Sequence, residues 1–130
     1  GVDWKDIPEG EPLFCASADG RGFAVSGGVA QAVVHAVKRI DPEREVKVVN
    51  AEGLQNCKKM LQMAKAGKYN GYLLEGMACP GGCVAGAGTL QPVKKAAVAL
   101  EKMKEEASFT EASDSKYQSR LESLEKFDVE

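Results

Sequence analysis

The 130-residue sequence lacks the features that mark membrane proteins and nucleic-acid-binding proteins. No apolar run approaches the ~20 residues that a membrane-spanning helix requires, and no signal peptide opens the chain. The formal net charge is only −2, so no basic surface points to nucleic acid or an anionic membrane as a partner. Hydrophobic residues make up 44% of the chain and charged residues 28%, which excludes a disordered protein. We therefore expect a folded, globular chain.

Glycine and proline are absent from the last thirty residues, where acidic side chains are in excess. All 14 glycines precede residue 89, and residues 101–130 hold nine acidic and five basic side chains. We predict a domain over residues 1–106, with its core in 13–106, followed by a polar acidic tail over 107–130. The tail contains four residues spaced for a short docking helix: Tyr117, Leu121, Leu124 and Phe127.

Short apolar segments alternate with segments of helical periodicity in the first hundred residues. The patterns predict three strands and three helices, in alternation: strands over 13–18, 45–50 and 71–75, and helices over 29–40, 53–66 and 93–106. This βαβαβα order favours an α/β fold, in which helices flank a mostly parallel sheet. Functional loops follow the carboxyl ends of strands in such sheets. The two candidate loops, 19–28 and 76–89, are both rich in glycine.

Two of the four cysteines, Cys79 and Cys83, lie in the second glycine-rich loop. Nothing in the sequence indicates secretion, so we expect free thiols, a cytoplasmic location and a metal or redox role. Pro80 fixes one φ angle, while Gly81 and Gly82 allow positive φ and a close approach of the backbone to a bulky group. Amides of such a turn favour an anion, and they would stabilise the thiolates and sulfides of an iron–sulfur cluster.

The other candidate ligands favour simpler interpretations. Zinc sites typically add a second Cys or His pair nearby, and His35, the only histidine, falls on an apolar helix face. Cys15, in the first predicted strand, and Cys57, on the apolar stripe of the second helix, are typical of buried cysteines that act as small hydrophobic residues. A glycine-rich turn with two inert thiols is the remaining alternative for Cys79 and Cys83.

The first glycine-rich loop ends at the start of a predicted helix, for which Ser26 is a candidate N-cap. Its glycines do not fit the G-x-G-x-x-G dinucleotide fingerprint, and no P-loop lysine follows Gly28. The amides at Gly27 and Gly28 either face an anion or allow the helix to pack closely on the sheet.

Residues 77–83, Met-Ala-Cys-Pro-Gly-Gly-Cys, resemble the third cysteine signature of the iron-iron hydrogenases. Residues 23–29, Phe-Ala-Val-Ser-Gly-Gly-Val, resemble the F-x-x-T/S-G-G-V segment that precedes this signature in the family, and the resemblance covers about residues 13–92. It implies that Cys79 ligates a 4Fe–4S cubane, and that Cys83 ligates it and bridges to a two-iron subsite. Met77 would line the pocket of that subsite. Ser26, Gly27, Gly28, Gly81 and Gly82 would complete the cofactor-binding residues.

The resemblance also implies that this chain is one lobe of a larger enzyme that interconverts protons, electrons and H₂. The two earlier cysteine signatures of the family do not occur here, and the chain begins with Gly1 rather than Met. We therefore expect an inactive fragment without the complete cofactor (the H-cluster), whose partners are the missing N-terminal lobe and a ferredoxin-like electron carrier. Ala85 and Thr89 stand where common members have Asn and Gln, which indicates a divergent subgroup.

Two functions of other classes remain as alternatives. One is a self-contained iron–sulfur electron-transfer or sensor module, in which Cys15 and Cys57 would join Cys79 and Cys83. The other is a non-catalytic α/β module that binds an anion at Gly27 and Gly28.

Overall fold

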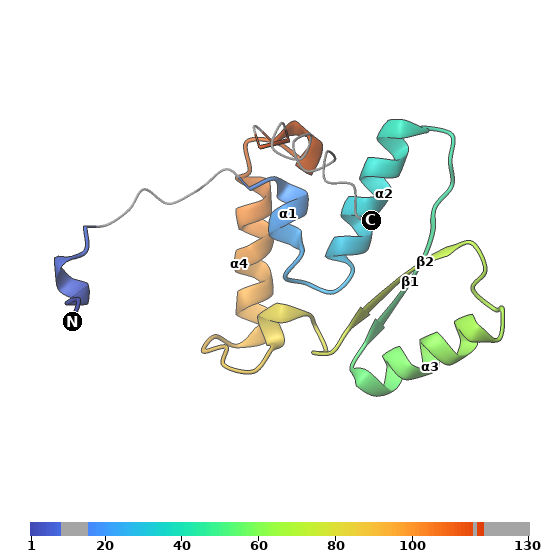
Figure 1. Ribbon diagram of the computed structural model, residues 1–130, viewed down its shortest axis with the longest axis horizontal. Coiled ribbons are helices and arrows are strands. Elements are labelled where there is room, and N and C mark those ends of the chain that lie inside the picture. The colour runs from blue at the N-terminus through green and yellow to red at the C-terminus, as the bar shows by residue number, and fades with distance from the viewer. Residues whose placement is uncertain (9–15, 116, 119–130) are drawn as a thin grey trace.

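The computed structural model describes residues 1–8, 16–115 and 117–118 (Figure 1). Four α-helices and two β-strands make up half of the described chain: α1 (Ala18–Gly22), α2 (Gly28–Ile40), β1 (Lys47–Glu52), α3 (Leu54–Lys65), β2 (Tyr72–Met77) and α4 (Val93–Glu105). Three short 3-10 helices complete the order: η1 (Trp4–Asp6), η2 (Cys83–Ala85) and η3 (Ala112–Asp114). Within the described ranges, no helix has both the length and the apolar character to cross a membrane.

The two strands form a parallel pair, which α3 connects as a crossover. Their register runs from Lys47 opposite Tyr72 to Glu52 opposite Met77. Side chains alternate between the two faces of a strand, and the contacts of β2 follow this rule. Glu75 reaches the start of α2, while a Cβ at Gly76 would lie 3.2 Å from the sulfur of Cys57 on α3. The helices α2 and α3 therefore cover opposite faces of the sheet.

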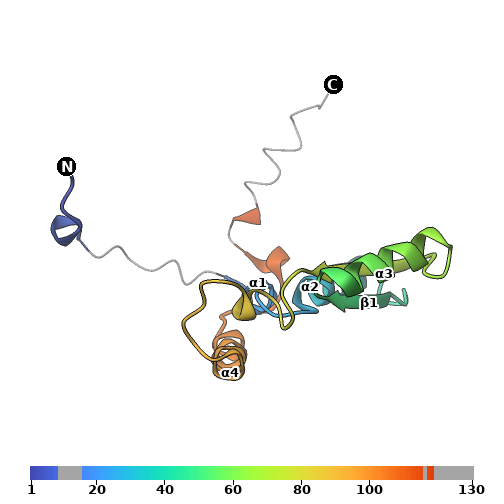
Figure 2. The ribbon, with the colours of Figure 1, turned by 90° about the horizontal axis from the view of Figure 1, so that it is seen from below.

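A second group of elements packs beside this sheet. α1 contacts both α2 and α4, and α4 and α3 lie on opposite sides of α2 in both views (Figures 1 and 2). The segment after α4 returns to α1, where the amides of Ala18 and Asp19 donate to the carbonyls of Phe109 and Thr110, each at 3.0 Å. The first part of the predicted tail is therefore bound to the fold.

Arg39 on α2 forms ion pairs with the next residues of this returning segment. Arg39 donates to Asp114 at 2.7 Å and to Glu111 at 3.0 Å. The hydrogen bonds to Asp114 and Glu111 raise the pKa of the Arg39 guanidinium above its ordinary value. The domain boundary at residue 106 stays a prediction.

The apolar core of the described chain is small. Its buried hydrophobic residues are Ala30, Ala51 and Met60. Large side chains such as Leu54, Leu90 and Val98 are more than two-thirds exposed. Close backbone contacts, such as the approach of Gly28 to Gly22, therefore add to the limited side-chain burial.

The α/β class predicted from the sequence is confirmed, with one correction at its first element. The helices and the last two strands lie within about two residues of their predicted bounds. The strand predicted over 13–18 falls outside the described residues at 13–15, and Ala18 begins α1 instead. Ser17 explains this difference, because its hydroxyl accepts a hydrogen bond from the amide of Gly20 at 2.9 Å and caps a helix. The predicted docking helix of the tail lies almost entirely outside the described residues.

Candidate functional site

The second glycine-rich loop lies against residues 24–26 at the carboxyl end of β2, and the first predicted loop, 19–28, is corrected because its residues 19–22 belong to α1. The amide of Val84 donates to the carbonyl of Ala24 at 3.1 Å. A Cβ at Gly82 would lie only 2.7 Å from this carbonyl oxygen and from the amide nitrogen of Ser26. The cysteine-bearing loop can make this contact because a glycine stands at its centre.

A tight turn separates the two cysteines of this loop. The amide of Gly82 donates to the carbonyl of Cys79 at 3.0 Å. Pro80 occupies the second position of the turn and Gly81 the third, with φ of 91°, which is the arrangement typical of a type II turn. Gly82 also has a positive φ, 89°. The backbone conformations predicted for Gly81 and Gly82 are therefore confirmed.

Both cysteines carry free thiols, and they differ in exposure. Cys79 is half-buried and Cys83 is exposed at the start of η2. The sulfur of Cys79 lies 3.5 Å from the position that a Cβ at Gly86 would take, so no side chain from Gly86 covers this thiol. Two soft sulfur ligands presented by one short turn suit half of the ligand set of an iron–sulfur cluster.

The amide of Gly81 is occupied from within the protein. It donates to Glu52 Oε2 at 2.9 Å, and Glu52 is the last residue of β1. The sequence predicted an anion-favouring turn here, and the anion at this amide is a carboxylate of the same chain. Sequence reasoning missed Glu52, because only the pairing of β1 with β2 brings it to the cysteine-bearing loop.

Cys57 was expected to be a buried cysteine on the apolar stripe of α3, and the structure shows it half-buried with a free thiol. Its thiol lies 3.5 Å from the carbonyl oxygen of Ala51 and 3.6 Å from that of Met77, against the backbone of Gly76. Within residues 1–8, 16–115 and 117–118, no three His, Cys, Asp or Glu side chains are placed to hold a metal ion together. Cys57 therefore does not join Cys79 and Cys83 in such a group, and Cys15 lies outside the described residues.

The start of α2 is a site of close backbone packing. A Cβ at Gly28 would lie 1.9 Å from the carbonyl oxygen of Gly22, so any side chain here would collide with α1. The N-cap position belongs to Gly27, with φ of 89°, and the prediction of Ser26 as N-cap is wrong. The left-handed conformation suits glycine, which has no Cβ to clash, and so the helix begins one residue later than a serine cap would start it.

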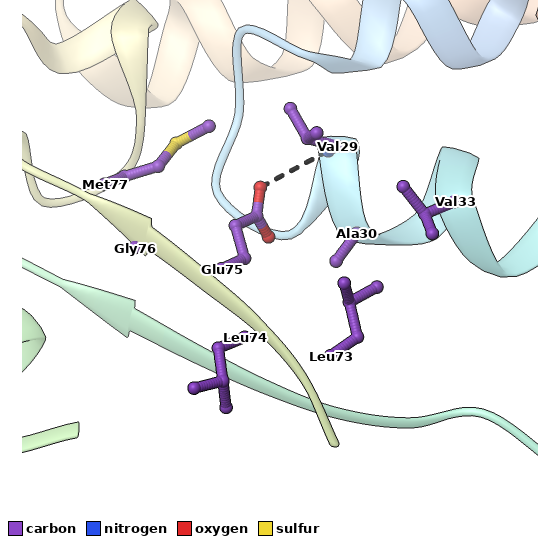
Figure 3. A pocket seen from close by; sticks show the side chains of 8 residues that line it. All are labelled: Val29, Ala30, Val33, Leu73, Leu74, Glu75, Gly76 and Met77. Carbon is purple, nitrogen blue, oxygen red and sulfur yellow. Dashed lines mark hydrogen bonds between the residues drawn. The ribbon is translucent and has the colours of Figure 1, made fainter. Parts of the chain in front are cut away.

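Glu75 takes the place that an external anion would occupy at this helix. Its Oε1 accepts a hydrogen bond from the amide of Val29 at 3.3 Å (Figure 3). The residue is only 9% exposed, and its Oε2 has no hydrogen-bond partner among the described residues. It lines a pocket of about 260 Å³ between α2 and β2, with Met77 at the same edge (Figure 3). Because a carboxylate of the same chain already lies at this helix N-terminus, Gly27 and Gly28 are better explained by close packing of the helix than by binding of an external anion.

Replacing Glu75 tests this internal cap. Glu75→Ala is expected to lower the free energy of unfolding by about 1 kcal/mol, because Val29 loses its acceptor and the helix dipole loses a negative partner. Urea unfolding of the chain measures the change. Glu105→Ala, at an exposed position of α4, is the matched control and should change stability by less than about 0.5 kcal/mol. Equal effects of the two substitutions would contradict the capping role.

His35 lies on α2, as predicted, and its partner is an acid that sequence reasoning missed. The Nδ1 of His35 lies 2.9 Å and 3.0 Å from the two carboxylate oxygens of Asp19, which is only 7% exposed. Asp19 is part of α1, so this pair joins α1 to α2. The pair is remote in sequence, and only the folding of residues 18–22 as a helix brings it together.

Comparisons with known proteins identify the family of the chain. Residues 1–87 match the model of the family described as "Iron only hydrogenase large subunit, C-terminal domain". The chain belongs to this family, which confirms the resemblance that residues 77–83 carry. It is also 33% identical over 122 residues to the periplasmic Fe hydrogenase large subunit of Nitratidesulfovibrio vulgaris, an alignment that covers 72% of this chain and 28% of that protein.

A second relative carries a different description. The chain is 37% identical over 57 residues to a probable cytosolic Fe-S cluster assembly factor of Aedes aegypti. This alignment covers 44% of the chain and 12% of that protein. The chain therefore spans well under a third of the length of either relative.

Proposed function

We propose that this chain is the C-terminal lobe of the catalytic domain of an iron-iron hydrogenase, and that it supplies two of the four cysteine ligands of the active-site cluster. Cys79 and Cys83 would be these ligands, and Cys83 would also hold the two-iron subsite. The observation that carries the proposal is the placement of the two free thiols on either side of one tight turn, just beyond the carboxyl end of β2. When bound, the cofactor supplies the redox chemistry that interconverts protons, electrons and H₂.

The residues of this chain hold the thiols in place and form one wall of the cofactor pocket. Gly81 and Gly82 shape the turn, and the contact of Gly82 with residues 24–26 closes the side that faces α1 and α2. Met77, at the end of β2, would line the side of the two-iron subsite. Ala85 and Thr89 lack the side-chain amides of the Asn and Gln that common members have at these positions. The hydrogen bonding around the cofactor would therefore differ from theirs.

The other parts of the proposal concern partners and location. The remaining two cysteine ligands would come from an N-terminal lobe of the same polypeptide, and a ferredoxin-like carrier would exchange electrons with the complete enzyme. We keep a cytoplasmic location as part of the proposal, although one relative is described as periplasmic. The isolated chain would be inactive, because a cubane needs four ligands and this loop offers two.

Anaerobic reconstitution of the isolated chain with iron and sulfide tests the half-site. We expect little bound iron, with all thiols free and the chain folded by circular dichroism. About four iron and four sulfide per chain, the content of a complete cubane, would instead show that four cysteines converge. That outcome would replace the proposal with the self-contained electron-transfer or sensor module.

One observation favours a second candidate function, a role in iron–sulfur cluster assembly without H₂ chemistry. The similarity to a probable assembly factor covers 44% of the chain, and Ala85 and Thr89 depart from the common hydrogenase pattern. A full-length protein that binds iron through Cys79 and Cys83 but neither consumes nor produces H₂ would support this candidate. The anion-binding module is less favoured, because Glu75 already accepts from the first turn of α2.

A further inference from the structure

Glu52 reaches across from β1 to the turn that separates the two thiols. Its Oε2 accepts a hydrogen bond from the amide of Gly81 at 2.9 Å, at the third position of that turn. We propose that Glu52 is a positioning residue for the thiol pair: its carboxylate holds the Cys79–Cys83 turn through the Gly81 amide and keeps that amide away from sulfur. The metal-binding part of this inference rests on the proposed function.

The backbone around Glu52 is itself held by several hydrogen bonds. Glu52 pairs in register with Met77, the residue at which β2 gives way to the cysteine-bearing loop. The side-chain amide of Asn56 donates to the carbonyl of Glu52 at 2.9 Å, and the amide of Gly53 donates to the carbonyl of Met77 at 2.8 Å. The carboxylate therefore extends from a fixed point, and the turn that it holds is fixed relative to the sheet.

The turn is held from its other side by a second anchor. Gly82 packs against the backbone of residues 24–26, and the amide of Val84 donates to Ala24. Glu52 thus holds the turn at Gly81, on the N-terminal side of Cys83. Residues 24–26 hold it at Gly82 and Val84, on either side of Cys83. Without Glu52, the turn would keep only one of its two anchors, and the two sulfurs would be less well oriented for one shared metal.

The hydrogen bond also has an electrostatic consequence for the proposed cluster. Amides that donate to cluster sulfurs raise the reduction potential, because they stabilise added negative charge. Glu52 holds one such amide of this turn and places its own negative charge beside it. Both effects make an added electron less favourable. Glu52 is therefore expected to lower the potential of a cluster bound through Cys79 and Cys83.

Two variants separate these roles in the isolated chain. Glu52→Ala removes the acceptor, whereas Glu52→Gln keeps an acceptor oxygen and removes the charge. The first readout is hydrogen exchange of the Gly81 amide, which needs no metal. We expect exchange to become at least about tenfold faster in Glu52→Ala, since an amide that loses its partner loses its protection. Glu52→Gln should restore most of the protection, and Glu45→Ala, at an exposed position before β1, should leave it unchanged.

The second readout is the binding of Cd²⁺, a soft metal ion that prefers thiolate ligands. Titration followed by the sulfur-to-metal charge-transfer band should show a severalfold weaker affinity in Glu52→Ala and near-complete rescue in Glu52→Gln. A Cys79→Ser/Cys83→Ser double variant subtracts binding elsewhere in the chain. Unchanged Gly81 exchange together with unchanged Cd²⁺ affinity in Glu52→Ala would overturn the positioning role.

The outcomes also separate this inference from the proposed function. If the wild-type chain bound Cd²⁺ no better than the double cysteine variant, the ligand role of Cys79 and Cys83 would fail. The exchange rate of Gly81 would still decide whether Glu52 holds the turn. In a full-length protein with its cluster, Glu52→Gln should raise the reduction potential measured by spectroscopic titration, and an unchanged or lower potential would contradict the electrostatic part.

Discussion

Gly82→Ala is expected to destabilise the chain by at least about 2 kcal/mol and to loosen the turn between the two cysteines. Gly82 has φ of 89° and ψ of −165°, a backbone conformation that is essentially restricted to glycine. A methyl group at this position would also lie 2.7 Å from Ala24 O and Ser26 N, closer than real Cβ contacts occur. Since these atoms belong to the backbone, neither can move aside by a simple side-chain rotation.

Gly88→Ala is the matched control for this substitution. Gly88 lies in the same loop with φ of 86°, but a Cβ there would have no atom within 4 Å. It therefore carries the strain of a positive φ without the collision, and we expect a loss of about 1 kcal/mol. Urea unfolding of both variants gives the difference. A loss for Gly82→Ala no larger than that for Gly88→Ala would contradict the close contact between the two glycine-rich loops.

Cys83→Ala and Cys79→Ala, each in the full-length subunit that would contain this chain, are expected to abolish assembly of the active-site cofactor. A cubane held by four thiolates loses one of its ligand bonds when either cysteine is replaced. H₂ uptake and evolution should fall to background in both variants. Metal analysis after anaerobic purification should show the loss of the iron atoms of the active-site cofactor, while iron bound elsewhere in the subunit is kept.

Cys57→Ala distinguishes ligation from general damage in the same experiment. Its thiol lies against the backbone carbonyls of Ala51 and Met77 and against Gly76, so its loss should reduce stability but leave the iron content unchanged. Full activity in Cys83→Ala would exclude the proposed ligand role. Equal loss of iron in Cys57→Ala would indicate that the cysteines converge in a way that the described residues do not show.

The elements with strong local signals could be predicted from the sequence. The helix from Gly28 has a regular apolar stripe, and β1 and β2 are short apolar segments, so their bounds were predictable to within about two residues. The same holds for the cysteine turn, because Pro80 followed by two glycines restricts the backbone to few conformations. Its positive φ angles follow from residue type alone.

One error concerns a local contact, whereas the omissions involve contacts between segments that are distant in sequence. Residues 16–18 looked apolar enough for a strand, but the hydroxyl of Ser17 caps a helix there. Glu52 and Glu75 are isolated acids in the sequence, and only the parallel register of β1 and β2 reveals which amides they accept from. No periodicity or motif encodes such a pairing, because it depends on where two separate strands end.

The small apolar core has a consequence for how this lobe folds. The loop that presents Cys79 and Cys83 is also a packing surface, since Gly82 lies against residues 24–26 and a Cβ at Gly81 would lie 3.5 Å from Val93 at the start of α4. We therefore expect folding of this part of the chain to be coupled to formation of the cysteine turn. A metal ion that binds both thiols should raise the midpoint of thermal unfolding with its concentration, so that heat stability reports directly on occupancy of the thiol pair.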